Sequence, residues 1–190
     1  MIIASQKRKE NIAEYLLYMW QIEDLIRAND LDIDKIKKSI IEKTVSDPET
    51  LRAMEEWYES LIDMMRREDV AKAGHLQMNK NIIGALADLN KRLLADPKFA
   101  DYQRQFYDVL PIIVELRAKS GDNPAGEIET CFNALYGLLT LRLKGAEVSA
   151  GTIEAVNKVA KFIAMLAHYY ALDEKDELFN DEKDDATGKK

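Results

Sequence analysis

Apolar residues recur along this chain at three- and four-residue intervals, the spacing of one face of an α-helix. The period is clear from Gln6 to Ala28, and again in the segment that follows Ser149. No run alternates strictly between apolar and polar residues as a half-buried β-strand does, and no hairpin signal occurs. The pattern therefore predicts an all-α fold.

Capping signals mark the helix boundaries. Two Asp-Pro pairs, at 47–48 and 96–97, join a good N-cap residue to a proline, which the first helical turn tolerates. Gly74 and Gly145 are suitable helix ends, because glycine readily adopts the left-handed conformation that closes a helix. These signals predict helices over about residues 6–28, 33–43, 48–73, 76–93, 97–119, 124–144 and 149–172.

The joints between these helices are short, so consecutive long helices should be antiparallel neighbours. We expect one domain over residues 1–175, an irregular bundle of six or seven helices. The two most apolar segments, 6–28 and 124–144, should be central. Residues 173–190 carry eight acidic residues and four lysines. Because such a composition buries little apolar surface, we expect residues 176–190 to form a disordered acidic tail.

Composition argues against several partners and locations. The formal net charge of −7 disfavours nucleic acid, whose phosphates repel an acidic protein. The most apolar segment, 131–143, is shorter than the roughly 20 residues that cross a membrane, and the N-terminus lacks the apolar stretch of a signal peptide. Cys131 is the only cysteine, which fits a reducing compartment. We therefore expect a cytoplasmic protein that binds neither nucleic acid nor membrane.

The familiar catalytic and cofactor motifs are missing. A di-iron carboxylate site needs Glu three residues before His on two helices, but Lys72 precedes His75 and Met165 precedes His168 at that spacing. One cysteine and two distant histidines make a poor zinc site, and no Gly-rich phosphate loop or nucleophile elbow occurs. We therefore expect no cofactor, and the sequence favours a protein without enzymatic activity.

Three acids in the segment 48–73 are the remaining candidates for metal chemistry. Glu56, Glu59 and Asp63 are spaced by three and four residues, a spacing that could hold Mg²⁺ as in helical nucleotide hydrolases. A helical wheel sets these acids about 100–200° from the centre of the apolar stripe. A solvated face is therefore the simpler interpretation.

Five polar residues fall within or beside apolar stripes: Glu23, Arg27, Glu68, His75 and Asn79. Glu23 and Arg27 are four residues apart and can pair, and Glu68 and His75 flank a predicted turn. Burying such groups is unfavourable unless they find partners. We expect either a satisfied network that fixes the helix register or a polar-floored pocket for a small molecule.

Aromatic residues of the segment 6–28 would wall such a pocket. Tyr15, Tyr18 and Trp20 point in quite different directions on the helical wheel. At least one should therefore reach the surface or a second interface, where exposed aromatics mark contact sites. The alternative is that all three pack around a central helix.

Two sequence blocks resemble a known family. One is the run KRKEN at 7–11 with the apolar residues 15–20 that follow, and the other is GHLQ at 74–77 with the helix after it. Together they resemble a family of bacterial proteins of about this length, known only as a domain of unknown function. The resemblance covers nearly the whole chain except the acidic tail. It implies a bacterial, cytoplasmic, stand-alone protein, and it implies no catalytic residue or ligand.

Three hypotheses follow. The first is a non-enzymatic helical protein that binds a protein partner or associates with itself, since catalytic motifs are missing and the segment 6–28 is apolar on a wide face. The second is a small-molecule pocket floored by the five polar residues, between the segments 6–28, 48–73 and 76–93. The third is an Mg²⁺-dependent nucleotide hydrolase that uses Glu56, Glu59 and Asp63.

Overall fold

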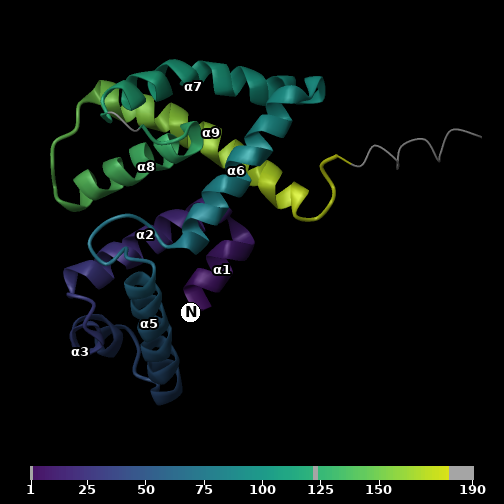
Figure 1. The fold of residues 1–190 in the computed structure, drawn as a ribbon. Coiled ribbons are helices and arrows are strands. Elements are labelled where there is room, and N and C mark those ends of the chain that lie inside the picture. Colours follow the sequence, from purple (N-terminus) through teal and green to yellow (C-terminus); the bar gives the residue numbers. More distant parts are fainter. Residues whose placement is uncertain (1, 122–123, 180–190) are drawn as a thin grey trace, which may run out of the picture. The chain divides into compact units, whose positions relative to one another are not determined.

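The structure is a computed structural model that describes residues 2–121 and 124–179. Within these ranges every regular element is a helix and no strand occurs, which confirms the all-α class. The elements in chain order are α1 (Ile2–Glu10), α2 (Ile12–Ala28), α3 (Ile33–Ile36), the π-helical turn η1 (Lys37–Ile41), α4 (Glu42–Thr44), α5 (Pro48–Arg67), α6 (Gln77–Ala95), the 3-10 turn η2 (Pro97–Phe99), α7 (Ala100–Ala118), α8 (Glu127–Leu143) and α9 (Ala150–Asp173). Figure 1 labels all of them except η1, α4 and η2.

The predicted N-caps form as expected. Asp47 accepts a hydrogen bond from the Thr50 backbone at 2.9 Å, and Pro48 occupies the first turn of α5. Ser149 caps α9 in the same way. Two predicted ends are wrong. The helix α5 stops at Arg67, so Gly74 does not end it as predicted, and α8 begins at Glu127 rather than at Pro124.

The predicted helix over 6–28 is interrupted at Asn11. The Asn11 side chain accepts a hydrogen bond from the backbone N–H of Ala13 at 3.0 Å, so it caps α2 and separates that helix from α1. Asparagine competes in this way because its short side chain reaches backbone donors two residues ahead. The apolar period alone did not reveal the break.

The predicted helix over 33–43 contains a π-helical turn, η1. Ile36, just before this turn, and Ile41, its last residue, are both fully buried. Two residues five positions apart lie about 140° apart around a regular α-helix. The wider π-helical turn brings both onto the buried side, which explains the departure from the α-helix.

The chain forms two compact units. Among the described residues, unit 1 comprises 2–10 and 14–82, and unit 2 comprises 11–13, 83–121 and 124–179. The core of unit 1 contains these buried residues: Leu16, Met19, Ile26, Met65 and Leu76. In unit 2, α7, α8 and α9 contact one another in pairs around the buried residues Tyr102, Phe106, Phe132, Phe162 and Leu166. A single domain over 1–175 stays a prediction.

The start of the expected acidic tail is packed in unit 2. Leu178 is buried, and the Phe179 ring lies 5.5 Å from the Phe99 ring. The Arg92 guanidinium lies over the Phe179 ring at 4.1 Å and also forms an ion pair with Asp173 at 2.7 Å. The rest of the predicted tail, 180–190, lies outside the described residues.

Candidate functional site

Glu23 of α2 is the one buried acid among the residues that the structure describes, with 1% of its surface exposed. Its carboxylate is 2.6 Å from His75 Nδ1 and accepts hydrogen bonds from the Leu76 backbone at 2.9 Å and from Asn79 Nδ2 at 2.7 Å. An ionised carboxylate only accepts, so Nδ1 of His75 carries a hydrogen. The Trp20 indole stacks on the His75 ring, with centroids 4.0 Å apart.

Arg27, one turn further along α2, holds the loop between α5 and α6. Its guanidinium donates to the backbone carbonyls of Val70, at 3.1 Å, and Gly74. The expected pairing with Glu23 is wrong, because Arg27 forms its ion pair with Asp24 at 2.8 Å. The guanidinium has five donors, which suits it to bridging carbonyls and a carboxylate together.

Glu68 acts at the other end of the same loop. It follows the last residue of α5, and its carboxylate accepts a hydrogen bond from the backbone of Gln77, the first residue of α6, at 2.5 Å. A carboxylate at a helix N-terminus satisfies a free N–H and complements the helix dipole. Glu68 therefore caps α6 and has no bond to His75.

The structure thus brings the five predicted polar residues to one loop, 68–76, where their main partners are one another and the backbone. None of the five lines the three hollows described below. One group is incompletely satisfied, since Asn79 Oδ1 is buried and accepts no hydrogen bond from the described chain. These contacts fix the α5–α6 connection onto α2, and the small-molecule pocket stays a prediction that they do not favour.

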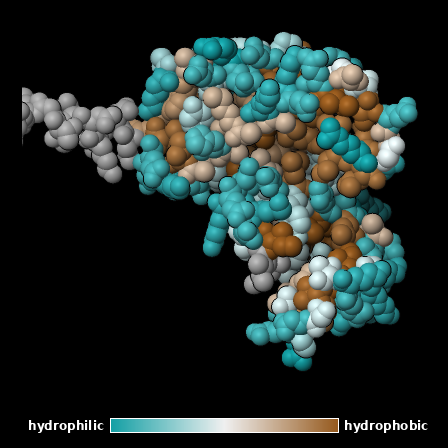
Figure 2. All heavy atoms as spheres, turned by 180° about the vertical axis from the view of Figure 1, so that it is seen from behind, coloured by the Kyte–Doolittle hydropathy of each residue, from teal (hydrophilic) through white to brown (hydrophobic). Residues whose placement is uncertain are grey.

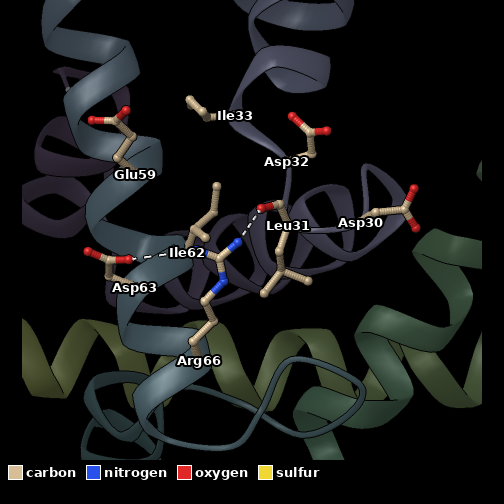
Figure 3. A pocket seen from close by; sticks show the side chains of 8 residues that line it. All are labelled: Asp30, Leu31, Asp32, Ile33, Glu59, Ile62, Asp63 and Arg66. Carbon is tan, nitrogen blue, oxygen red and sulfur yellow. Dashed lines mark hydrogen bonds and ion pairs between the residues drawn. The ribbon is translucent and has the colours of Figure 1, made fainter.

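A hollow of about 540 Å³ lies beside the turn between α2 and α3 (Figure 3). Its lining residues are Asp30, Leu31, Asp32, Ile33, Glu59, Ile62, Asp63 and Arg66. Arg66 donates to the Leu31 carbonyl at 3.0 Å and lies 3.9 Å from Asp63. Asp30 pairs with Lys35 at 2.5 Å, and Asp32 caps α3. Most of the acidic charge in this hollow is therefore already engaged within the chain.

The acids considered for Mg²⁺ are divided between two hollows. Glu59 and Asp63 line the hollow in Figure 3, whereas Glu56 lines another, with Pro48 and Arg52. Throughout the described part of the chain, no group of three or more His, Cys, Asp and Glu residues could hold a metal ion. The structure gives this alternative no assembled ligand set.

The three aromatics of α2 have separate surroundings. Tyr15 lines a hollow of about 150 Å³ with Met19, Trp57 and other residues, whereas Trp20 stacks on His75. Tyr18 neighbours Tyr58, whose pKa is raised to about 12, mainly by burial and further by Tyr18. The structure therefore does not show these aromatics as the wall of one common pocket.

Helix α8 leaves an uncharged face uncovered. No charged residue occurs from 130 to 141, and the buried residues of α8 are Ile128, Thr130, Cys131, Phe132 and Leu138. On other sides Leu141 is 42% exposed and Leu143 75% exposed. The sequence predicted a central helix here, whereas in the structure α8 is covered only in part. We define the open face of α8 as Asn133, Gly137, Thr140 and Leu141, which are exposed or half-buried.

Gly137 lies within this open face and has no packing reason inside the chain. A Cβ added at Gly137 would meet no atom of the described residues within 4 Å. Glycine in a helix interior is destabilising by roughly 0.5–1 kcal/mol relative to alanine. The helix therefore carries a destabilising residue at a position where its own fold has room for a side chain.

A family model described as "Domain of unknown function (DUF4924)" matches residues 1–177. The chain belongs to the DUF4924 family. This confirms the resemblance to an uncharacterised family. No curated protein and no solved structure matches the chain.

In this DUF4924 protein, none of the described helices combines the length and apolar character needed to cross a membrane. The open face of α8 is the feature that sequence reasoning missed. The sequence did contain a signal for this face, namely the absence of charge from residues 130 to 141. At the chain's average of 32% charged residues, twelve residues would carry about four charges, whereas this stretch carries none. That stretch was interpreted as a buried helix, which has the same composition.

Proposed function

We propose that this protein is a non-enzymatic helical interaction module, and that its docking surface is the open face of α8. One observation carries the proposal: a stretch of twelve uncharged residues on α8 presents Asn133, Gly137 and Leu141 at the surface of unit 2. Protein interfaces are depleted of charged residues at their centres.

A second exposed apolar pair lies on α7 in the same unit. Tyr107 and Val114 are 63% and 57% exposed and lie seven residues apart, on one face of the helix. Figure 2 shows hydrophobic residues at the surface among hydrophilic ones on the face that it draws. Exposed apolar residues on one face of a helix are candidates for a contact surface. We assign this module to the cytoplasm, since its single cysteine needs no oxidising compartment.

The experiment compares two equivalent substitutions on one helix. Leu141→Glu changes the open face, while Leu143→Glu changes an even more exposed leucine about 120° around the helix from Gly137. An apolar fluorescent dye added to the folded protein reports accessible apolar surface. We expect Leu141→Glu to lower the dye signal at least twofold more than Leu143→Glu. Equal effects of the two substitutions would contradict a docking surface at this face.

A further inference from the structure

The hollow of about 150 Å³ beside Tyr15 differs in its lining from the two larger hollows. More than half of the residues that line each larger hollow are charged: Asp30, Asp32, Glu59, Asp63 and Arg66 in one, and Glu49, Arg52 and Glu56 in the other. The smaller hollow has one charged residue, Arg8, and its other lining residues are mostly apolar or aromatic. Apolar walls with a few polar groups that orient the ligand are typical of small-molecule sites.

We infer that this hollow binds a small organic carboxylate. The apolar body of the ligand lies against Met19, Trp57 and Leu61, and its carboxylate lies against Arg8 and Tyr15. All residues that line the hollow belong to unit 1, so the inference is independent of the proposed docking surface on unit 2. The site also differs from the pocket expected from the sequence, because none of its five polar floor residues lines this hollow.

Side chains of α2 and α5 form the apolar walls. Met19 of α2 and Leu61 of α5 are almost fully buried, with 1% and 2% of their surface exposed. Trp57 and Met64 share a face of α5 with Leu61 and are half-buried, so they stand at the edge of the hollow. An apolar cavity of about 150 Å³ holds one benzene ring. The apolar body of the ligand therefore has about six carbon atoms.

Tyr15 supplies a hydrogen-bond donor inside the hollow. The residue is 4% exposed, and its hydroxyl makes no hydrogen bond with the described residues although its oxygen is not sealed from solvent. Burial raises the pKa of this hydroxyl, Arg8 partly offsets the rise, and Glu23 adds to it. The hydroxyl therefore keeps its proton at neutral pH and can donate to a carboxylate oxygen.

Arg8 supplies the positive charge. Its guanidinium lies 5.8 Å from the centroid of the Tyr15 ring, and it forms no ion pair with any described residue. The neighbouring Lys7, by contrast, pairs with Glu14 at 3.1 Å. A guanidinium binds a carboxylate through two parallel hydrogen bonds, which fixes the orientation of the ligand.

The charges favour an anion with a single negative charge. One cation lines the hollow, whereas the whole chain has a formal net charge of −7, so a doubly charged anion would be repelled more strongly than one carboxylate. Glu23, two turns along α2 from Tyr15, adds to the negative potential at the hydroxyl. A monocarboxylate with an apolar body of about six carbons therefore fits both the charge and the volume.

The test is a calorimetric titration of the full chain with three probes: phenylacetate, its neutral analogue phenylacetamide, and acetate. Phenylacetate has both the ring and the charge, whereas each of the other probes lacks one of them. A ligand of this size should bind with a dissociation constant of about 0.1–1 mM, and at least fivefold more tightly than either other probe. Absence of phenylacetate binding at about 10 mM, or an equal affinity for phenylacetamide or acetate, would overturn the inference.

Arg8→Gln and Lys9→Gln form a matched pair on α1. Each removes one positive charge from an exposed residue, but only Arg8 lines the hollow. Arg8→Gln should weaken phenylacetate binding at least tenfold and abolish the preference over phenylacetamide, while Lys9→Gln should change neither. Equal effects of the two substitutions would overturn the assignment of the carboxylate to this site.

Tyr15→Phe removes the hydroxyl and keeps the ring. Because the hydroxyl has no partner among the described residues, the melting temperature should not fall. Phenylacetate binding should weaken at least threefold, while the weaker binding of phenylacetamide changes less. Unchanged phenylacetate binding would overturn the placement of the carboxylate at Tyr15.

Discussion

Replacing Glu23 by Gln should strongly destabilise unit 1. The buried carboxylate has three neighbours that donate to it: His75 Nδ1, the Leu76 backbone and Asn79 Nδ2. In the variant, an amide NH₂ group replaces one of the two carboxylate oxygens of residue 23. This NH₂ group can only donate hydrogen bonds, yet it faces another donor. A hydrogen bond to a charged group contributes about 1.5–3 kcal/mol, and an unsatisfied buried polar group costs about 1–3 kcal/mol. We therefore expect the free energy of unfolding to fall by about 3–5 kcal/mol, within the sum of these two contributions.

Urea unfolding followed by tryptophan fluorescence measures this effect directly. Both tryptophans of the chain, Trp20 and Trp57, belong to unit 1, so their emission reports the unfolding of that unit. With a urea dependence of about 2 kcal/mol per molar, the midpoint should fall by about 1.5–2.5 M. Circular dichroism of the same samples follows the helices of the whole chain.

The matched control is Glu14→Gln on the same helix. The Glu14 side chain is 60% exposed and pairs with Lys7 at the surface, so its loss should leave the midpoint unchanged within error. If Glu23→Gln costs less than about 1 kcal/mol, or no more than Glu14→Gln, the loop 68–76 is not held by the buried carboxylate and the reasoning fails.

Three further predictions concern unit 2. Burial raises the pKa of the Cys131 thiol to about 12, and the nearby Glu127 carboxylate raises it further. A thiol reagent at pH 8 should therefore react with Cys131 only as the protein unfolds. Fast reaction with the folded protein would contradict this prediction. Since the folded chain holds this proton more tightly than the unfolded one, whose thiol has a pKa near 9, the thiol's contribution to stability is complete below pH 9 and falls as the pH rises towards 12. Arg92→Ala removes the ion pair with Asp173 and the contact with the Phe179 ring, so chymotrypsin should cleave after Phe179 roughly two- to fivefold faster. Lys91→Ala, on the neighbouring exposed residue, is the control and should leave the cleavage rate unchanged.

Local signals in the sequence predicted the helices well where a single residue type determines the conformation. Asp47 and Ser149 begin helices because their side chains accept from backbone N–H groups that the helix itself cannot satisfy. Asn11 uses the same chemistry, but it lies inside a continuous apolar period, and the period dominated the prediction. The sequence shows that Asn11 could cap a helix, but the continuous apolar period around it favoured one uninterrupted helix.

The candidate site shows where sequence reasoning stops. The sequence shows that three polar residues interrupt apolar stripes: Glu23, His75 and Asn79. It does not show that they contact one another, because those contacts depend on how the loop 68–76 folds onto α2. The open face of α8 was missed for a related reason. Composition shows that a helix prefers apolar surroundings, but it does not show whether the same chain or another one provides them.

The π-helical turn η1 also bears on how the length of this chain can vary. A π-helical turn holds one residue more than the α-helical turn that it replaces. Removing one residue from Lys37–Ile41 would leave Ile36 and the present Ile41 four positions apart, about 40° around a regular helix. Both isoleucines would still face the core, and the segment from α3 to α4 would become one continuous helix. This segment can therefore lose one residue and still keep both isoleucines on its buried side. A regular α-helix does not tolerate such a deletion, because each deleted residue rotates the following side chains by about 100°.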